Sequence, residues 1–137
     1  QFPAHAVERA VQRSGLAPLV AARGLDAPCG ENGCRLSGGE RQRVSIARCL
    51  LRGTPVLLLD EATAALDNQT AFAVTQAVLD LDGLTRLVVT HRLDDALLRR
   101  YDEIIVLRDG AVCERGRFDQ LMRRMGYFYS LYTVSKG

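Results

Sequence analysis

The chain has 137 residues, of which 47% are hydrophobic and 25% charged, and its formal net charge at pH 7 is +2. These values are ordinary for a globular domain and exclude a disordered or collagen-like chain. The charges are scattered, so bulk charge predicts neither a nucleic-acid partner nor binding to a membrane surface. The longest apolar runs are short, and we expect a soluble chain without a membrane-spanning helix.

The N-terminus and the cysteines indicate the origin of the chain. The first residues lack an initiator Met and a signal-peptide pattern, which is typical of an excised fragment. The cysteines form no C-x-x-C pair and the two histidines are far apart, so no zinc site is expected. A chain of this size and apolar content needs no disulfides, which predicts free thiols in a reducing compartment. The four cysteines are Cys29, Cys34, Cys49 and Cys113.

Helical periodicity dominates the first part of the chain. Apolar residues recur at three- and four-residue steps over residues 4–23, and a break at Ser14-Gly15 predicts two short helices. Residues 24–36 show no period and predict an ordered loop. A third helix is expected from Ser37 to about Arg52, opened by an S-x-x-E capping box. Its expected buried stripe consists of Val44, Ala47, Leu50 and Leu51.

Short apolar runs then alternate with helical segments. The run at residues 56–59 is typical of a strand covered on both faces. Further strands are expected at 87–90 and 103–107, and Asp109-Gly110 predicts a β-hairpin. This order of strands and helices predicts an α/β layered sheet with parallel crossovers. Because the first buried strand comes late, we expect the sheet to need strands encoded before Gln1. Helices are expected after Asp67, with Val74, Val78 and Leu81 on one face, and at about 94–100, 118–124 and 127–134.

Two glycines stand in the first turn of the helix that begins at Ser37. Each glycine costs about 1 kcal/mol relative to Ala, and capping alone does not require them. They are explained if a bulky anion must approach the N–H groups of that turn closely. For these four residues alone, a plain capped helix remains the simpler interpretation.

Polar residues follow two of the predicted strands. Asp60 can hold a hydrated Mg²⁺ and Glu61 can orient water, although acids at such positions also cap helices. His91 follows the second strand, which places it at the same sheet edge if the strands are parallel. Its neutral imidazole can donate to a phosphate oxygen, although a lone His is more often a structural hydrogen-bonding group.

Three ordered segments together resemble the ATP-binding domain of ABC transporters. Residues 36–43 resemble the family signature, residues 56–67 the Walker B motif with its D-loop, and residues 90–93 the switch histidine. Only the second half of the domain is covered, and no G-x-x-x-x-G-K-[ST] phosphate loop occurs. The resemblance implies part of an α-helical signature subdomain at 1–52. It then implies, at 53–137, half of a P-loop NTPase (RecA-like) α/β core with parallel strands and flanking helices.

The resemblance also implies a role for each matching residue. Asp60 would hold Mg²⁺ through water, Glu61 would polarise the attacking water, and His91 would sense the γ-phosphate of ATP. Asp67 would communicate across the interface of a head-to-tail dimer. In that dimer the signature would clamp ATP seated on the second ATP-binding domain. The implied signature residues are Leu36, Ser37, Gly38, Gly39 and Glu40.

Details of the motifs resemble those of exporters. Residues 30–33 resemble the loop that touches the transmembrane domains, with Glu31 as the matching acid, and residues 126–132 resemble an exporter C-terminal helix. The resemblance therefore implies ATP hydrolysis coupled to export of an unknown substrate at the cytoplasmic face of the cell membrane. The departures are Glu40 where Gln is common, Ala64 where Ser is common, and Ala27-Pro28-Cys29 where Thr and Val are frequent.

Two alternatives remain open at this stage. The C-terminal half of a DNA-repair or chromosome-maintenance ATPase carries the same motifs, but no heptads lead into the signature and the net charge is weak. A non-enzymatic interaction fragment is the other, and its unpaired sheet edge predicts an oligomeric, swapped or marginally stable chain. Without a phosphate loop, we expect the isolated chain to lack ATPase activity. The remaining expectations are a solvated arginine face (Arg41, Arg43, Arg48, Arg52) and aromatic packing anchors (Tyr127, Phe128, Tyr129, Tyr132).

Overall fold

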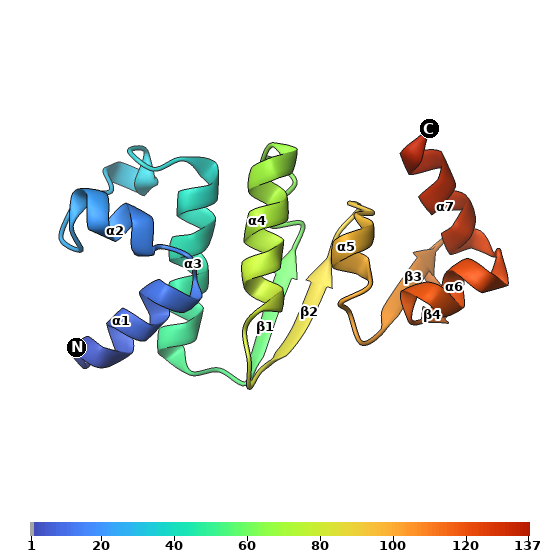
Figure 1. The fold of residues 1–137 in the computed structure, drawn as a ribbon, viewed down its shortest axis with the longest axis horizontal. Helices are drawn as coiled ribbons and strands as arrows, with labels where there is room; N and C mark the ends of the chain where they lie inside the picture. Colours follow the sequence, from blue (N-terminus) through green and yellow to red (C-terminus); the bar gives the residue numbers. More distant parts are fainter. Residues whose placement is uncertain (1) are drawn as a thin grey trace. The chain divides into compact units, whose positions relative to one another are not determined.

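The computed structural model describes residues 2–137, which form two compact units, one ending at Thr90 and the other beginning at His91 (Figure 1). The first unit contains α1 (Ala4–Arg13), α2 (Ala17–Arg23), a 3₁₀ turn (Glu31–Gly33), α3 (Gly38–Arg52), β1 (Val56–Asp60), α4 (Asn68–Leu79) and β2 (Thr85–Val89). The second unit contains α5 (Asp95–Leu98), β3 (Ile104–Arg108), β4 (Ala111–Gly116), α6 (Phe118–Arg124) and α7 (Tyr127–Lys136). The helices and strands expected from the sequence are confirmed, with shifts of at most two residues at their ends.

A parallel strand–helix–strand crossover forms the centre of the first unit. β1 and β2 pair in parallel, with Val56 opposite Thr85 and Asp60 opposite Val89, and α4 connects them. Arg86 on β2 donates hydrogen bonds to the carbonyl oxygens of Leu79 at 2.6 Å and Leu81 at 2.7 Å. These bonds satisfy carbonyls at the end of α4 that have no partner inside the helix. The expected parallel crossover is confirmed for this pair of strands.

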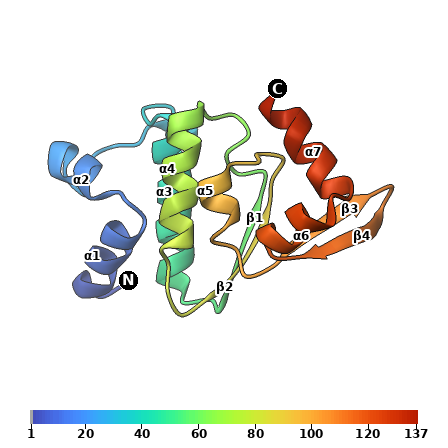
Figure 2. The same ribbon diagram turned by 45° about the vertical axis from the view of Figure 1, so that its right-hand side comes forward.

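The core of the first unit lies between β1, α3 and α4. It contains Ile46, Leu57, Leu59, Val74, Val78 and Leu81. Figures 1 and 2 show α3 and α4 side by side. The expected common face is confirmed for Val74 and Val78 of α4, which are completely buried; Leu81, expected on the same face, is buried as well but lies beyond the end of the helix.

The buried part of α3 differs from the expected stripe. Of the four predicted residues only Ala47 is buried, and Ile46 beside it is buried as well. Ile46 packs in the core with β1 and α4, whereas Ala47 packs with Ala10 and Leu16 of the α1–α2 hairpin. Because α3 contacts partners on two sides, burial is spread around the helix instead of following one stripe.

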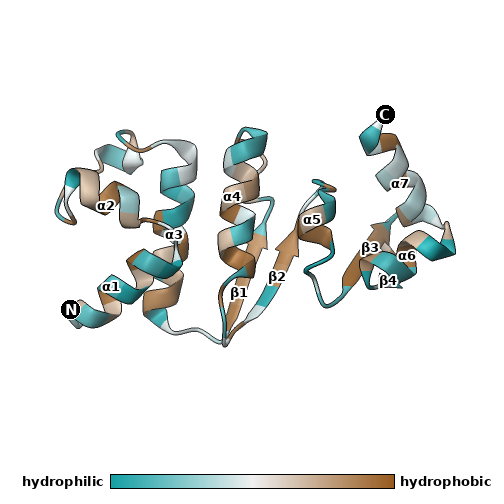
Figure 3. Ribbon diagram, in the orientation of Figure 1, coloured by the Kyte–Doolittle hydropathy of each residue, from teal (hydrophilic) through white to brown (hydrophobic). Residues whose placement is uncertain are grey.

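The strands of the first unit alternate between buried and exposed residues. Leu57 and Leu59 are each 6% exposed, whereas Val56 and Leu58 are 53% and 65% exposed. Figure 3 shows β1 as an almost continuous apolar strand. The expectation of a strand covered on both faces is therefore wrong for β1, because the helices of this unit pack on one face only in the part of the chain described here. The self-association expected from an unpaired sheet edge stays a prediction.

The second unit is built on an antiparallel hairpin. β3 pairs with β4 through a turn at Asp109-Gly110, as expected. Within residues 2–137, β3 and β4 form their own two-stranded sheet, separate from the sheet of β1 and β2. A two-residue turn brings β4 beside β3 at once, and this local pairing requires little loop-closure entropy.

Aromatic residues pack the helices of the second unit together. The rings of Phe118 and Phe128 meet edge to face at 6.0 Å, in a core completed by Leu98, Val106 and Leu121. Tyr132 of α7 hydrogen-bonds to Asp95 of α5, which lowers the pKa of Asp95. The expected anchoring role is confirmed for Phe128. None of the helices formed by residues 2–137 combines the length and the apolar character needed to cross a bilayer.

We predict that Leu121→Ala destabilises the second unit by about 2–5 kcal/mol, because Leu121 is completely buried and its truncation leaves a cavity. Urea unfolding followed by tyrosine fluorescence measures this effect, since the chain has no Trp and its four Tyr residues all lie after position 100. The matched control is Leu107→Ala, because Leu107 is 64% exposed. Its expected change is below about 0.5 kcal/mol, and equal effects of the two substitutions would contradict the assigned core.

Candidate functional site

The first turn of α3 carries the capping box expected from the sequence. Ser37 accepts a hydrogen bond on its hydroxyl from the Glu40 N–H at 3.2 Å. The Glu40 carboxylate in turn accepts one from the Ser37 N–H at 2.7 Å. This backbone hydrogen bond lowers the pKa of Glu40 below its ordinary value of 4.5. Two N–H groups that a helix leaves unsatisfied at its start are thus satisfied locally.

The two glycines of this turn allow α3 to pack closely on the segment that begins α4. A Cβ atom on Gly38 would lie 2.7 Å from Cδ2 of Leu66, and one on Gly39 would collide with the methyl group of Thr70. Leu66 and Thr70 flank Asp67 in the sequence. Packing within the chain therefore requires these glycines. This explanation is additional to the close approach of an anion that we proposed from the sequence.

Asp67 caps α4, as the sequence predicted. Its carboxylate accepts a hydrogen bond from the Thr70 N–H at 2.9 Å. A hydrogen bond from the Thr70 side chain is the main cause of the lowered pKa of Asp67, followed by this backbone bond. Thr70 thus holds Asp67 with its hydroxyl and covers Gly39 with its methyl group. No sequence motif singled out Thr70; its position three residues after an N-cap Asp was the available signal.

The acidic pair lies at the carboxyl end of β1. Asp60 is the last residue of the strand, and the Glu61 N–H donates to the Val89 carbonyl of β2 at 2.9 Å. Glu61 has φ of +44°, a left-handed conformation that is uncommon for residues other than glycine. Such backbone conformations cost energy and concentrate at functional sites. Both residues are exposed, so their carboxylates are accessible to a ligand.

The structure brings several of the predicted site residues into one unit. The first unit holds Asp60, Glu61, Asp67 and residues 36–40, and contacts of Gly38 and Gly39 join the signature segment to the D-loop segment. Within it Ser37 is exposed, Leu36 and Glu40 are half-buried, and Gly39 is buried. His91 is the first residue of the second unit and follows β2 by two positions. The structure describes each unit by itself, so it does not bring His91 together with the acidic pair.

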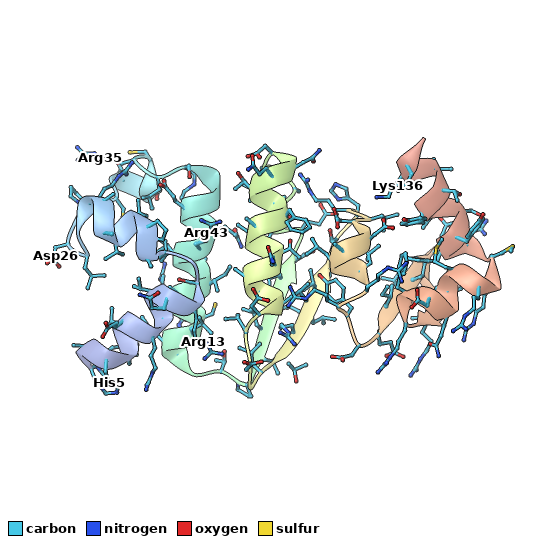
Figure 4. The ribbon with its side chains drawn as sticks, in the orientation of Figure 1. His5, Arg13, Asp26, Arg35, Arg43 and Lys136 are labelled. Atoms are coloured by element: carbon cyan, nitrogen blue, oxygen red, sulfur yellow. The ribbon has the colours of Figure 1, made fainter. Side chains whose placement is uncertain are left out.

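One arginine departs from the expected solvated face of α3. Arg41, Arg48 and Arg52 are exposed, as expected. Arg43 is half-buried and packs on the turn between α1 and α2, where its Nε lies 3.6 Å from the position of a Cβ on Gly15 (Figure 4). Its Nε is buried without a hydrogen-bond partner. Arg43 therefore belongs to the packing of the helical region.

The fold and the arrangement of these segments define the class of the protein. A parallel β–α–β crossover, with acids at the end of its first strand and a glycine-bearing helix N-terminus packed beside it, is part of an α/β nucleotide-binding domain of the P-loop NTPase fold. The solved structure of a bacterial Atm1-family ABC exporter with ATP bound has this architecture, with a TM-score of 0.84 and 33% identity. It matches 100% of this chain, which covers 24% of that structure's chain.

Sequence comparisons identify the family. Residues 5–64 match the family described as ABC transporter. The chain is 43% identical over 134 residues to the ATP-dependent lipid A-core flippase of Vibrio vulnificus. The match covers 96% of this chain and 23% of the flippase. The chain is 46% identical over 129 residues to the flippase of the same name from Neisseria meningitidis, covering 92% and 20% respectively. The chain belongs to the ABC transporters and corresponds to part of the ATP-binding domain of an exporter. It spans less than a quarter of the length of these relatives.

We predict that Gly39→Ala lowers the free energy of unfolding by about 1–3 kcal/mol, as overpacking does, in the chain without nucleotide. The added methyl meets Thr70, whose β-branched side chain has few rotamers in a helix. If the site were open, alanine would instead stabilise the helix by about 1 kcal/mol. Urea unfolding followed by circular dichroism gives the sign.

Thr70→Ser supplies the matched control, because serine keeps the hydroxyl and the N–H that hold Asp67 but lacks the methyl group over Gly39. We expect the double variant Gly39→Ala/Thr70→Ser to recover most of the loss, a coupling that a double-mutant cycle measures. A stabilised Gly39→Ala chain, or additive effects of the two substitutions, would refute the packing argument.

We predict that Glu40→Gln makes stability less dependent on acidic pH. Because folding lowers the pKa of Glu40 below 4.5, its contribution is present above that pH and is lost as the pH falls through the lower folded value. Glutamine can still accept the Ser37 N–H but does not titrate. As the pH is lowered from about 6 to 3, the urea midpoint of Glu40→Gln should therefore fall less steeply than that of the parent chain. Glu8→Gln, an exposed carboxylate on α1, is the control that should keep the parent slope.

Proposed function

We propose that this chain supplies the signature, Walker B, D-loop and switch segments of an ATPase that drives export across a membrane. The observation that carries the proposal is the packing of the signature turn on the D-loop helix in the unit that also carries Asp60 and Glu61. Three motifs that are separate in the sequence therefore lie in one compact unit. The similarity to an exporter structure with ATP bound supports the same conclusion.

The acidic pair has the donor chemistry of a magnesium–nucleotide site. Within residues 2–137 no three His, Cys, Asp or Glu side chains cluster as a protein-only metal site requires. Mg²⁺ is commonly held by one or two carboxylates together with phosphate oxygens and water, which suits Asp60. Bound Mg²⁺ and ATP supply the transferable phosphoryl group and neutralise its charge. Glu61 then orients water as the family's catalytic carboxylate, and His91 donates to the γ-phosphate.

Two surfaces of the chain are assigned to partners. The N-terminus of α3 presents Ser37 and the N–H groups of its first turn, and a helix N-terminus favours an anion. We assign residues 36–40 to ATP held by a second ATP-binding domain in a head-to-tail dimer, with Asp67 at the same interface. Glu31, exposed in the loop before α3, is assigned to the transmembrane domains. With these partners, we assign the site to the cytoplasmic face of the membrane. We assign no nucleic-acid partner to the chain.

The proposed domain division and substrate rest on family likeness. We assign residues 1–52 to the helical signature subdomain and 53–137 to the α/β core. The relatives from Vibrio vulnificus and Neisseria meningitidis are named lipid A-core flippases. An amphipathic lipid is therefore the substrate class to test first.

The test uses the whole transporter that contains this chain. We predict that Glu61→Gln lowers ATP turnover by about 10²-fold or more, since a positioned catalytic base contributes at least that much, while ATP binding is retained. Phosphate release and binding of a fluorescent ATP analogue measure the two properties. Glu8→Gln on α1 is the control and should leave both unchanged. Full turnover in Glu61→Gln would overturn the role of this residue.

The isolated chain is expected to release no phosphate from ATP. It contains no phosphate loop, which provides most contacts to the β- and γ-phosphates in such enzymes. Turnover by the purified chain that disappears in Glu61→Gln would contradict this expectation.

A further inference from the structure

Two cysteines stand five positions apart in the loop between α2 and α3. Cys29 and Cys34 are both exposed, and both are free thiols in the structure. Neither belongs to a motif of the ATP-binding domain, and Cys29 lies where the sequence departs from the common exporter pattern. The other cysteines differ in position, because Cys49 is half-buried on α3 and Cys113 lies on β4.

Main-chain hydrogen bonds close this loop into a ring with the two cysteines at its base. The Arg35 N–H donates to the Cys29 carbonyl at 3.0 Å. This hydrogen bond links the peptide group after Cys29 to the peptide group after Cys34. The α-carbon of each cysteine is therefore part of a peptide group that takes part in the bond. A disulfide needs α-carbons about 4.4–6.8 Å apart, and this hydrogen bond holds the two cysteines beside each other at the base of the ring. Figure 4 shows Arg35 at this loop.

The side chain of Cys34 turns back toward the start of the loop. A Cβ built on Gly30 would lie 2.6 Å from the Cys34 Sγ, so this sulfur rests on the residue next to Cys29. Gly30 has φ of +76°, a conformation that glycine adopts without strain. A glycine at this position therefore both permits the turn and leaves the space that the sulfur occupies.

The thiol of Cys29 is held only weakly. Its Sγ lies 3.8 Å from the Ala27 carbonyl oxygen, and a thiol is a weak donor. Little interaction is lost when this side chain rotates toward Cys34. The main-chain hydrogen bond thus holds two exposed thiols at the base of the ring.

We propose that Cys29 and Cys34 form a reversible dithiol–disulfide site that reacts with small disulfides such as oxidised glutathione. The thiolate of one cysteine attacks a sulfur of the oxidant, whose S–S bond breaks and releases one glutathione thiolate. The thiolate of the second cysteine then attacks the protein sulfur of the mixed disulfide and releases the second glutathione. The protein loses two electrons and two protons, and the oxidant becomes two thiols.

Trypsin isolates this pair from the other cysteines. Cleavage after Arg23 and Arg35 places Cys29 and Cys34 on one peptide, residues 24–35, whereas the other two cysteines fall in residues 49–52 and 109–115. The folded chain is treated with oxidised glutathione, free thiols are alkylated, and the peptides are weighed by mass spectrometry. We expect peptide 24–35 to lose two hydrogen atoms and to carry neither glutathione nor alkyl groups.

Matched variants identify the two steps. Cys34→Ser should leave one stable glutathione on peptide 24–35, because the second thiolate is missing, and Cys113→Ser should behave as the parent chain. We expect closure to be at least about tenfold faster in the folded chain than in urea, since the ring orients the thiols. A persistent glutathione adduct on the parent peptide, two alkylated cysteines, a disulfide to another peptide, or equal rates in urea would overturn the proposal.

Discussion

The contact between the first turn of α3 and the first turn of α4 determines the geometry of the candidate site. Gly38 and Gly39 have no side chains, and Leu66 and Thr70 fill the space that side chains there would occupy. Each of these turns is also capped by its own side chain, Ser37 on α3 and Asp67 on α4. A helix whose first turn is both capped and packed has little freedom to fray. The first turn of α3 and the segment that follows the acidic pair are thereby fixed to each other.

Local chemistry explains why much of the fold was predictable from the sequence. Ser37 with Glu40, Asp67 before α4, and Asp109-Gly110 between two apolar runs are signals that act within four residues, and each produced the expected cap or turn. The predicted face of α4 also formed, because Val74 and Val78 meet a single core. By contrast, the burial of α3 depends on two packing partners, which its own periodicity does not reveal.

The errors concern contacts between segments distant in the sequence. The apolar run at Val56–Leu59 resembles a strand buried on both sides, yet hydrophobicity alone does not say which face is covered within a given stretch of chain. Thr70 was missed for a similar reason. Its methyl group is important for packing only because α3 passes beside it. For Asp60 and Glu61, by contrast, the residue types alone indicated the chemistry.

Arg86 gives the first unit a means of fixing strand alignment. Its guanidinium on β2 reaches carbonyl oxygens at the end of α4, which precedes β2 in the chain. Successive residues of a strand point to opposite faces, so a slip of one residue would turn this side chain away from the helix and leave those carbonyls unsatisfied. The hydrogen bonds from Arg86 therefore favour one alignment of β2. In that alignment Val89 lies opposite Asp60 and the carbonyl oxygens at the end of α4 are satisfied.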